Sequence, residues 1–195
     1  MPTERIEIVP YDVRWPVEFD ALGVKIRGAL GELALRINHI GSTSVPGLPA
    51  KNVIDVQVAV AALDRETLAT RLTAVGLVFR EPVDRDHVPP AGPPTEMDWR
   101  KLFFRQATPE GRRANIHVRV LGAANQRYAV LFRDYLRASI TARDSYAAVK
   151  RALAELHPDN IDAYLLVKDP VCDIIIEAAE LWAKTVGWET PATDG

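Results

Sequence analysis

Two consecutive segments, HIGSTSVPGLPAK at residues 39–51 and VIDVQVAV at residues 53–60, decide the fold of this chain. The second segment is rich in β-branched residues and follows a turn, which predicts a strand. Residues 35–40 form a short apolar segment, which predicts another strand that leads into Gly41. The first segment is therefore a turn between two strands, in which three consecutive hydroxyl residues follow Gly41 directly and Lys51 closes the segment.

The composition is that of a globular protein. The chain has 195 residues, 48% of them hydrophobic, so we expect a single domain over residues 1–195. A formal charge of −2 predicts no bulk attraction for nucleic acid or for an anionic membrane surface. Cys172 is the single cysteine, which excludes a disulfide framework, and its apolar neighbours predict a buried thiol. The first residues lack a signal-peptide profile and no apolar run is long enough to span a bilayer, so we expect a cytoplasmic protein.

The residues around the turn predict further strands and helices. Alternation at 6–8 predicts a short edge strand, and helical spacing of apolar residues predicts a helix over 15–35. Asp64 is a favourable N-cap for a helix over 64–75, and a strand over 77–79 follows. The first half of the chain thus alternates between strands and helices.

The middle of the chain predicts a long loop and a hairpin. Five prolines and several charges at 81–98 show no period, which predicts a loop and makes this segment a candidate lid. Residues 99–105 and 114–121 alternate like paired strands, with 109–113 as the turn between them.

The last third of the chain has a helical pattern. We expect helices at 131–137, near 144–156, and from Asp159 or Asn160 to Lys184. Pro170 should kink or split the last of them. The fold class is therefore α+β, a mixed sheet with flanking helices and a helical C-terminal layer. We expect the sheet in about residues 1–122, the helical part in about 123–188 and a tail over 189–195.

Polar side chains share one face of two predicted strands. Because successive side chains alternate across a strand, Asp55 and Gln57 point away from the apolar residues between them. The same rule separates His117 and Arg119 from Ile116 and its apolar neighbours. If the two strands are neighbours in the sheet, these polar residues converge on one patch beside the glycine turn.

Structural explanations exist for each of these features. Alternating polar residues often mark only the solvated face of an antiparallel sheet, and Gly-Ser-Thr-Ser is common in tight turns. Lys51 is then a surface lysine, and His39 and His87 are structural or exposed. Two Tyr-x-x-x-Lys pairs, Tyr146/Lys150 and Tyr164/Lys168, share helix faces as packing pairs normally do.

The turn HIGSTSVPGLPAK with the strand NVIDVQV resembles the GrpB family, whose members look like small relatives of the nucleotidyltransferases related to DNA polymerase β. The resemblance continues through RKLFF at 100–104, NIHVRV at 115–120 and LFRDYLR at 131–137, and so covers nearly the whole chain. It is closest to the GrpB-like C-terminal region of actinobacterial dephospho-CoA kinases. It implies a nucleotidyltransferase-like fold. The P-loop of a kinase is absent from the sequence.

The resemblance also implies a site. In that superfamily a Gly-Ser turn, here Gly41-Ser42, approaches a triphosphate, and a strand with two carboxylates at i and i+2 holds magnesium ions. Asp55 matches the first carboxylate, but the second position is Gln57, and His117 stands where a third acid is expected. A standard two-metal site is therefore not expected, and Glu96 or Asp98 from the proline-rich loop are candidate substitutes.

Two hypotheses for function follow from the resemblance. In the first, the protein binds a nucleoside triphosphate and transfers a nucleotidyl group to a small-molecule acceptor. Gly41, Ser42 and Ser44 then hold phosphate, and Asp55 with Gln57 binds one Mg²⁺. His117 acts as a ligand or base. The positive charges that neutralise the phosphates come from Lys51, Arg105 and Arg119. In the second, it is a non-catalytic accessory or folding-assistance module with a degenerate nucleotide or anion site. Gln57 favours the second hypothesis, and the intact turn with Asp55 favours the first.

Overall fold

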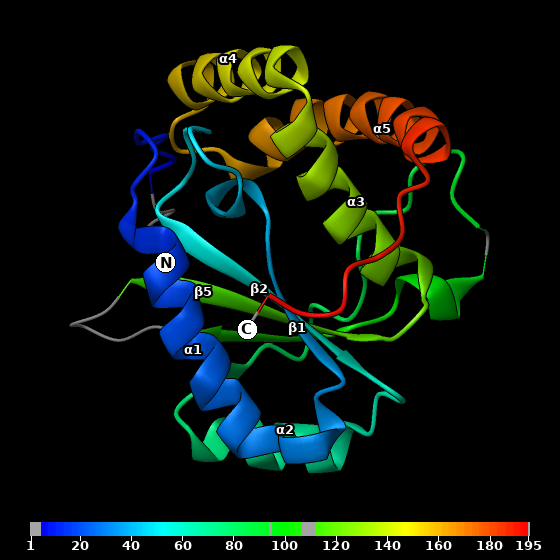
Figure 1. Cartoon of the computed structure of the whole chain (residues 1–195). Coiled ribbons are helices and arrows are strands. Elements are labelled where there is room, and N and C mark those ends of the chain that lie inside the picture. The colour runs from blue at the N-terminus through cyan, green and yellow to red at the C-terminus, as the bar shows by residue number, and fades with distance from the viewer. Residues whose placement is uncertain (1–4, 94, 107–111, 195) are drawn as a thin grey trace.

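The computed structural model describes residues 5–93, 95–106 and 112–194. A five-stranded sheet has the order β1-β2-β5-β4-β3 (Figure 1). Its strands are β1 (Arg36–Ile40), β2 (Val53–Val60), β3 (Val78–Phe79), β4 (Leu102–Gln106) and β5 (Arg113–Val120). β2 pairs with β5 in parallel, and the other neighbouring strands pair antiparallel. The predicted mixed sheet is confirmed, including the turn that joins β1 to β2.

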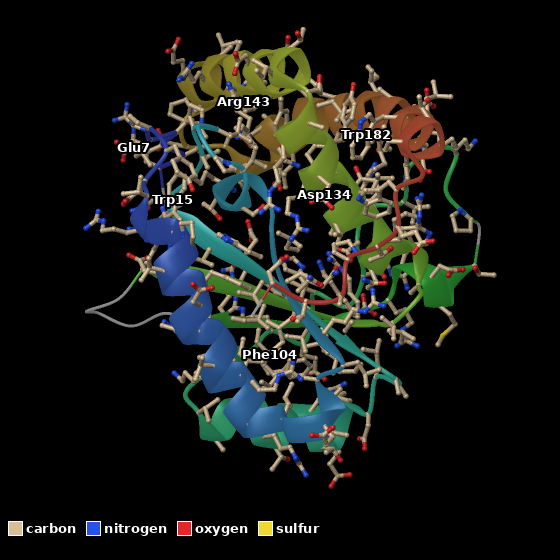
Figure 2. All side chains as sticks on the ribbon, in the orientation of Figure 1. Glu7, Trp15, Phe104, Asp134, Arg143 and Trp182 are labelled. Atoms are coloured by element: carbon tan, nitrogen blue, oxygen red, sulfur yellow. The ribbon has the colours of Figure 1, made fainter. Side chains whose placement is uncertain are left out.

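Two helices, α1 (Arg14–Leu30) and α2 (Arg65–Ala74), cover one face of the sheet. Apolar side chains from both helices and from alternate strand positions form the main core, and Figure 2 shows Trp15 and Phe104 in this layer. The predicted N-cap is present, because the Asp64 carboxylate accepts a hydrogen bond from the Thr67 amide. α1 ends five residues before its predicted limit, at Gly31 with a φ of 57°.

Three helices cover the opposite face: α3 (Ala124–Ala138), α4 (Ile140–Leu156) and α5 (Ile161–Val186). They gather at the top of Figure 1, across the sheet from α2, which confirms the predicted C-terminal helical layer. Of the two outcomes expected at Pro170, a kink or a split, the split does not occur, because α5 runs through this residue. Pro170 and Leu166 are both exposed, so the carbonyl that loses its helical partner faces water.

The N-terminal segment differs from its prediction. Instead of a strand over 6–8, the structure has an isolated bridge between Val9 and Ala50. Ile6 is buried against α4 and α5, and its amide donates to the Pro158 carbonyl. Packing against these helices, rather than strand pairing, therefore buries the apolar residues of this segment.

The C-terminal tail protects the open edge of β1. The Asp194 amide donates to the Ile37 carbonyl, and the Asp194 carboxylate accepts from the His39 amide and from Arg133. Unpaired strand edges favour aggregation, so this segment also covers a vulnerable part of the sheet.

The segment at 81–98 is largely irregular, as predicted. It forms a bridge between Arg85 and Arg100 and ends in a 3₁₀ turn over Glu96–Trp99. The antiparallel pair of β4 and β5 confirms the predicted hairpin. Most of its predicted turn at 109–113 lies outside the described residues.

Candidate functional site

A cavity of about 350 Å³ lies between the polar face of the sheet and the helices α3, α4 and α5. The parallel register sets Asp55 beside Asn115 and Gln57 beside His117, so these residues share one face of the sheet. This face is covered by the C-terminal helices and is not a solvated outer surface. The structure thus brings together the polar stripes that the sequence placed on two separate strands.

Gly41 and Asp55 form the floor of the cavity in close contact. Gly41 has a φ of 69° and a ψ of −172°, a conformation that other residues rarely adopt. A Cβ atom at this position would lie 2.5 Å from Asp55 Oδ2. Asn115 fixes the carboxylate by donating to Oδ1 at 2.9 Å. Glycine is therefore required at position 41 for two reasons, its backbone angles and the approach of Asp55.

The two serines of the turn have different environments. Ser42 lines the cavity, and its Oγ accepts a hydrogen bond of 2.9 Å from Lys150 Nζ. Ser44 is buried outside the cavity lining, and its Oγ donates to the Gly41 carbonyl at 2.6 Å. Ser42 is therefore placed to contact a ligand, whereas Ser44 stabilises the turn.

Three lysines, Lys51, Lys150 and Lys168, line the same cavity. Lys150 is 3% exposed, and its Nζ donates to Ser42 and to the Pro49 carbonyl. Burial lowers the pKa of Lys150 to about 7, and the charges of Lys168 and Lys51 act in the same direction. Of these three lysines, only Lys168 forms an ion pair with a carboxylate of a described residue, with Asp169 at 2.7 Å.

The Tyr-x-x-x-Lys spacing predicts only packing roles for Lys150 and Lys168. Their partners Tyr146 and Tyr164 also line the cavity, and the Lys150 ammonium lies 4.7 Å from the centre of the Tyr146 ring. The spacing alone put each pair on one helix face, but nothing in it indicated that both faces meet at the Gly41 turn.

Gln57 does not line the cavity. Its side chain is fully buried, Oε1 accepts from Arg119 at 2.5 Å, and Nε2 donates to the Gln126 carbonyl at 3.1 Å. Both polar groups of the carboxamide are therefore occupied by protein partners. The structure places Gln57 on the face of Asp55, as expected from strand alternation, but turned away from a position where it could hold a ligand.

Asp86, from the 81–98 loop, is a site residue that the sequence analysis missed. Its carboxylate accepts from Arg119 at 2.8 and 3.0 Å and from Lys101 at 2.7 Å. Burial alone would raise the pKa of Asp86, but the charges of Arg119 and Lys101 hold this pKa well below its usual range. Of the acids expected instead, Asp98 accepts from Thr95 at the 3₁₀ turn and the side chain of Glu96 lies outside the described residues.

His117 lies between the two carboxylates. Its Nδ1 is 3.4 Å from both Lys101 Nζ and Arg119 Nη2, which can only donate, so the ring proton belongs on Nε2. Nε2 faces Asp55 Oδ1 at 3.9 Å, too far for a direct hydrogen bond. Burial lowers the pKa of His117 to about 4, so the ring is neutral at pH 7. A ring with so low a pKa, whose free nitrogen faces two cations, is poorly suited to act as a general base.

Of the three remaining predicted residues, Lys51 and Arg119 line the cavity and Arg105 does not. Lys51 lines the cavity near Asp55, and burial of its amine lowers its pKa although part of the side chain is exposed. Arg105 shares the polar face, opposite Asn115, but is exposed and outside the cavity lining. Arg119 is buried and held by Asp86.

The two histidines considered structural or exposed have those roles. His39 is buried, stacks on Phe19 at 4.7 Å and contacts Thr43 Oγ1 through Nε2 at 3.0 Å. His87 is more exposed and contacts Asp173 of α5 at 3.0 Å, which ties the 81–98 loop across the cavity. The predicted lid is therefore in contact with the helical layer.

The donor set of the cavity fits at most a single Mg²⁺. Among the described residues, no group of three or more histidine, cysteine, aspartate or glutamate side chains could hold a metal ion. Mg²⁺ often binds through one carboxylate and the phosphates of its substrate, and Asp55 can serve that mode.

None of the described helices has the length and apolar character that crossing a membrane requires.

Comparisons with known proteins agree with this architecture. The family model for GrpB protein matches residues 5–178. A UPF0157 protein of Halalkalibacterium halodurans is 36% identical over 177 residues, covering 89% of this chain and 82% of that protein. The crystal structure of conserved protein GrpB from Enterococcus faecalis superimposes with a TM-score of 0.69 at 27% identity, covering 90% of this chain and 99% of that one.

A longer relative shares the same region. A dephospho-CoA kinase of Mycolicibacterium paratuberculosis is 36% identical over 199 residues, which cover 94% of this chain and 48% of the kinase. The present chain thus spans about half the length of that relative. The family model covers most of the chain, and the UPF0157 relative matches over most of its own length. This chain belongs to the GrpB family.

Proposed function

We propose that this protein binds a nucleoside triphosphate with Mg²⁺ and transfers a nucleotidyl group to a small-molecule acceptor. One observation carries the proposal: the Gly41-Ser42 turn and Asp55 face a cavity that also contains three lysine side chains. Like charges held together in a partly desolvated cavity repel one another, which favours a ligand with several negative charges. A triphosphate is such a ligand.

The phosphate end of the proposed site is the turn and its lysines. Ser42 presents a hydroxyl, and Lys150 reaches the same point from α4. Lys51 approaches from the start of β2, where the Asp55 carboxylate partly offsets its charge. Burial lowers the pKa of Lys150 and of Lys51 and so disfavours their charged forms. An anion bound beside them would counteract this effect and favour the charged forms.

Asp55 is the residue that would hold Mg²⁺. The ion would supply charge neutralisation and alignment of the attacking and leaving oxygens. Gln57 is not included in the metal site, because Arg119 and the Gln126 carbonyl occupy its carboxamide. Asn115 donates to the Asp55 carboxylate and so positions it for this role, while the neutral ring of His117 faces it without a direct hydrogen bond.

The transfer itself requires positioning more than covalent help from the protein. The acceptor hydroxyl loses its proton to solvent and its oxygen bonds to the α-phosphorus, while the bond from that phosphorus to the oxygen shared with the β-phosphate breaks and pyrophosphate leaves. Lys51 and Lys150 lie where they can offset the charge that develops on the leaving group. Water is excluded in part by the 81–98 loop, which His87 and Asp173 tie to α5.

An accessory role without catalysis is the second candidate. Its support is that the Arg119 guanidinium donates to both the Gln57 oxygen and the Asp86 carboxylate. A positive side chain therefore lies where further metal ligands would be expected. A module of this kind binds the nucleotide or another anion but releases no pyrophosphate.

Isothermal titration calorimetry with ATP, GTP, CTP and UTP, with and without Mg²⁺, tests the proposed function. We expect binding of at least one nucleotide, stronger with Mg²⁺. Lys150→Met should weaken it roughly tenfold or more, since hydrogen bonds to charged groups contribute about 1.5–3 kcal/mol. Lys184→Met removes the same charge from an exposed position of α5 and is the matched control. Absence of heat with every nucleotide refutes the proposal, and binding without pyrophosphate release over a panel of small acceptors favours the accessory role.

A further inference from the structure

Asn125, in the first turn of α3, has a buried amide oxygen without a hydrogen-bond partner among the described residues. The residue is 1% exposed and lines the cavity. Its amide nitrogen donates to Asp86 Oδ2 at 3.1 Å and to the Arg100 carbonyl at 2.9 Å. Two acceptors around the nitrogen fix the orientation of the amide, so the group left over is an acceptor. Buried polar groups are normally paired, which makes Asn125 a candidate ligand contact.

Aromatic side chains surround this end of the cavity. Tyr128, one turn after Asn125, lies 6.2 Å from Trp99 in an edge contact and 6.1 Å from Phe132 in a stacked one, measured between ring centres. All three rings line the cavity. Aromatic surfaces of this kind accept the flat face of a nucleotide base.

The contacts run continuously from this aromatic end to the glycine turn. Phe132 contacts Tyr146 with ring centres 5.6 Å apart, and Tyr146 lies under the Lys150 ammonium, which donates to Ser42. The step from Asn125 to Phe132 alone spans roughly 10 Å along α3. The cavity is therefore polarised, with an aromatic and amide end and a lysine end, as an elongated base, sugar and triphosphate requires.

We propose that Asn125 is a specificity-determining residue that accepts a hydrogen bond from the exocyclic amino group of the nucleotide base. The proposal rests on the proposed function, because it names the base that the same cavity selects. Adenine, cytosine and guanine carry such an amino group, whereas uracil and hypoxanthine do not. The Asn125 nitrogen is already used by Asp86 and Arg100, so the side chain cannot reverse to serve a base that offers only a carbonyl there.

Matched nucleotide pairs test this on the unaltered protein. The pairs are ATP with purine riboside triphosphate, GTP with ITP, and CTP with UTP, each titrated with Mg²⁺ by calorimetry. In the pair that binds best, we expect the amino-bearing nucleotide to bind at least tenfold more tightly, since an unpaired buried acceptor is costly. Equal affinities within that pair overturn this proposal while nucleotide binding stands. No binding of any nucleotide overturns both this proposal and the proposed function.

A variant assigns the discrimination to one side chain. Asn125→Ala should reduce the ratio of affinities within the best pair to about one. Asn38→Ala is the matched control, because no described residue is a hydrogen-bond partner of the buried Asn38 Oδ1 either, but Asn38 lies on β1 outside the cavity lining. Retention of the full ratio in Asn125→Ala overturns the assignment. If that variant does not fold, the nucleotide pairs on the unaltered protein still decide.

Discussion

Replacement of Gly41 by alanine tests the contact between the turn and Asp55. The backbone angles of Gly41, a φ of 69° with a ψ of −172°, belong to a region that is nearly exclusive to glycine and costs other residues about 1–3 kcal/mol. The new Cβ would also lie 2.5 Å from Asp55 Oδ2, and Asn115 restrains that carboxylate. Overpacking of this kind costs about 1–3 kcal/mol. The free energy of unfolding should therefore fall by about 2–6 kcal/mol in Gly41→Ala.

Urea unfolding followed by circular dichroism measures this change. Gly76→Ala is the control, because Gly76 has a φ of 83° but no atom within 4 Å of an added Cβ. We expect Gly41→Ala to cost at least 1 kcal/mol more than the control. Addition of Asp55→Ala should recover part of this difference, since the oxygen in conflict is then removed. Equal costs at positions 41 and 76 would show that the approach of Asp55 does not constrain the turn.

Three further changes have defined outcomes. Asp55→Asn should abolish the dependence of nucleotide binding on Mg²⁺ in calorimetry while the protein stays folded; unchanged dependence would place the metal elsewhere. Lys150→Met should raise the free energy of unfolding at pH 7 while weakening nucleotide binding. Burial lowers the pKa of Lys150 to about 7, so the folded protein with lysine loses stability as the pH falls from about 10 towards 7, and the methionine variant does not. A variant that is less stable at pH 7 contradicts this. Burial lowers the pKa of His39 to about 4, so its contribution to stability is complete above pH 6.5 and falls by about 2 kcal/mol between pH 7 and 5. In urea unfolding, His39→Gln should remove that part of the pH dependence, and an unchanged slope would count against it.

Local patterns predicted most of the sheet because they carry their own geometry. The alternation at 53–60 defines which side chains of β2 face the core, and the parallel pairing with β5 preserves that alternation across the two strands. Pro170 and the segment at 6–8 were misjudged because solvent exposure and packing against α4 and α5 decide their structure. Neither influence is visible in a short stretch of sequence.

The same distinction separates the site residues that were predicted from those that were not. Asp55 and His117 were found because they belong to strands, where residue spacing fixes the face. Asp86 comes from an irregular loop, and Lys150 and Asn125 come from helices of the C-terminal layer. Their positions depend on tertiary packing, so residue type and spacing gave no direct signal for them.

Charged groups of the cavity that no oppositely charged side chain balances, among the described residues, limit what it can bind. Asp86 is balanced by Arg119 and Lys101, so this cluster needs nothing from a ligand. On the opposite side, Lys150 has no described carboxylate partner, and Asp55 is held by the neutral Asn115 and faced by a neutral imidazole. A matching ligand must bring negative charge to the lysine and positive charge to the carboxylate. A nucleoside triphosphate bound to Mg²⁺ brings both in one molecule, whereas a simple anion would leave Asp55 facing added negative charge.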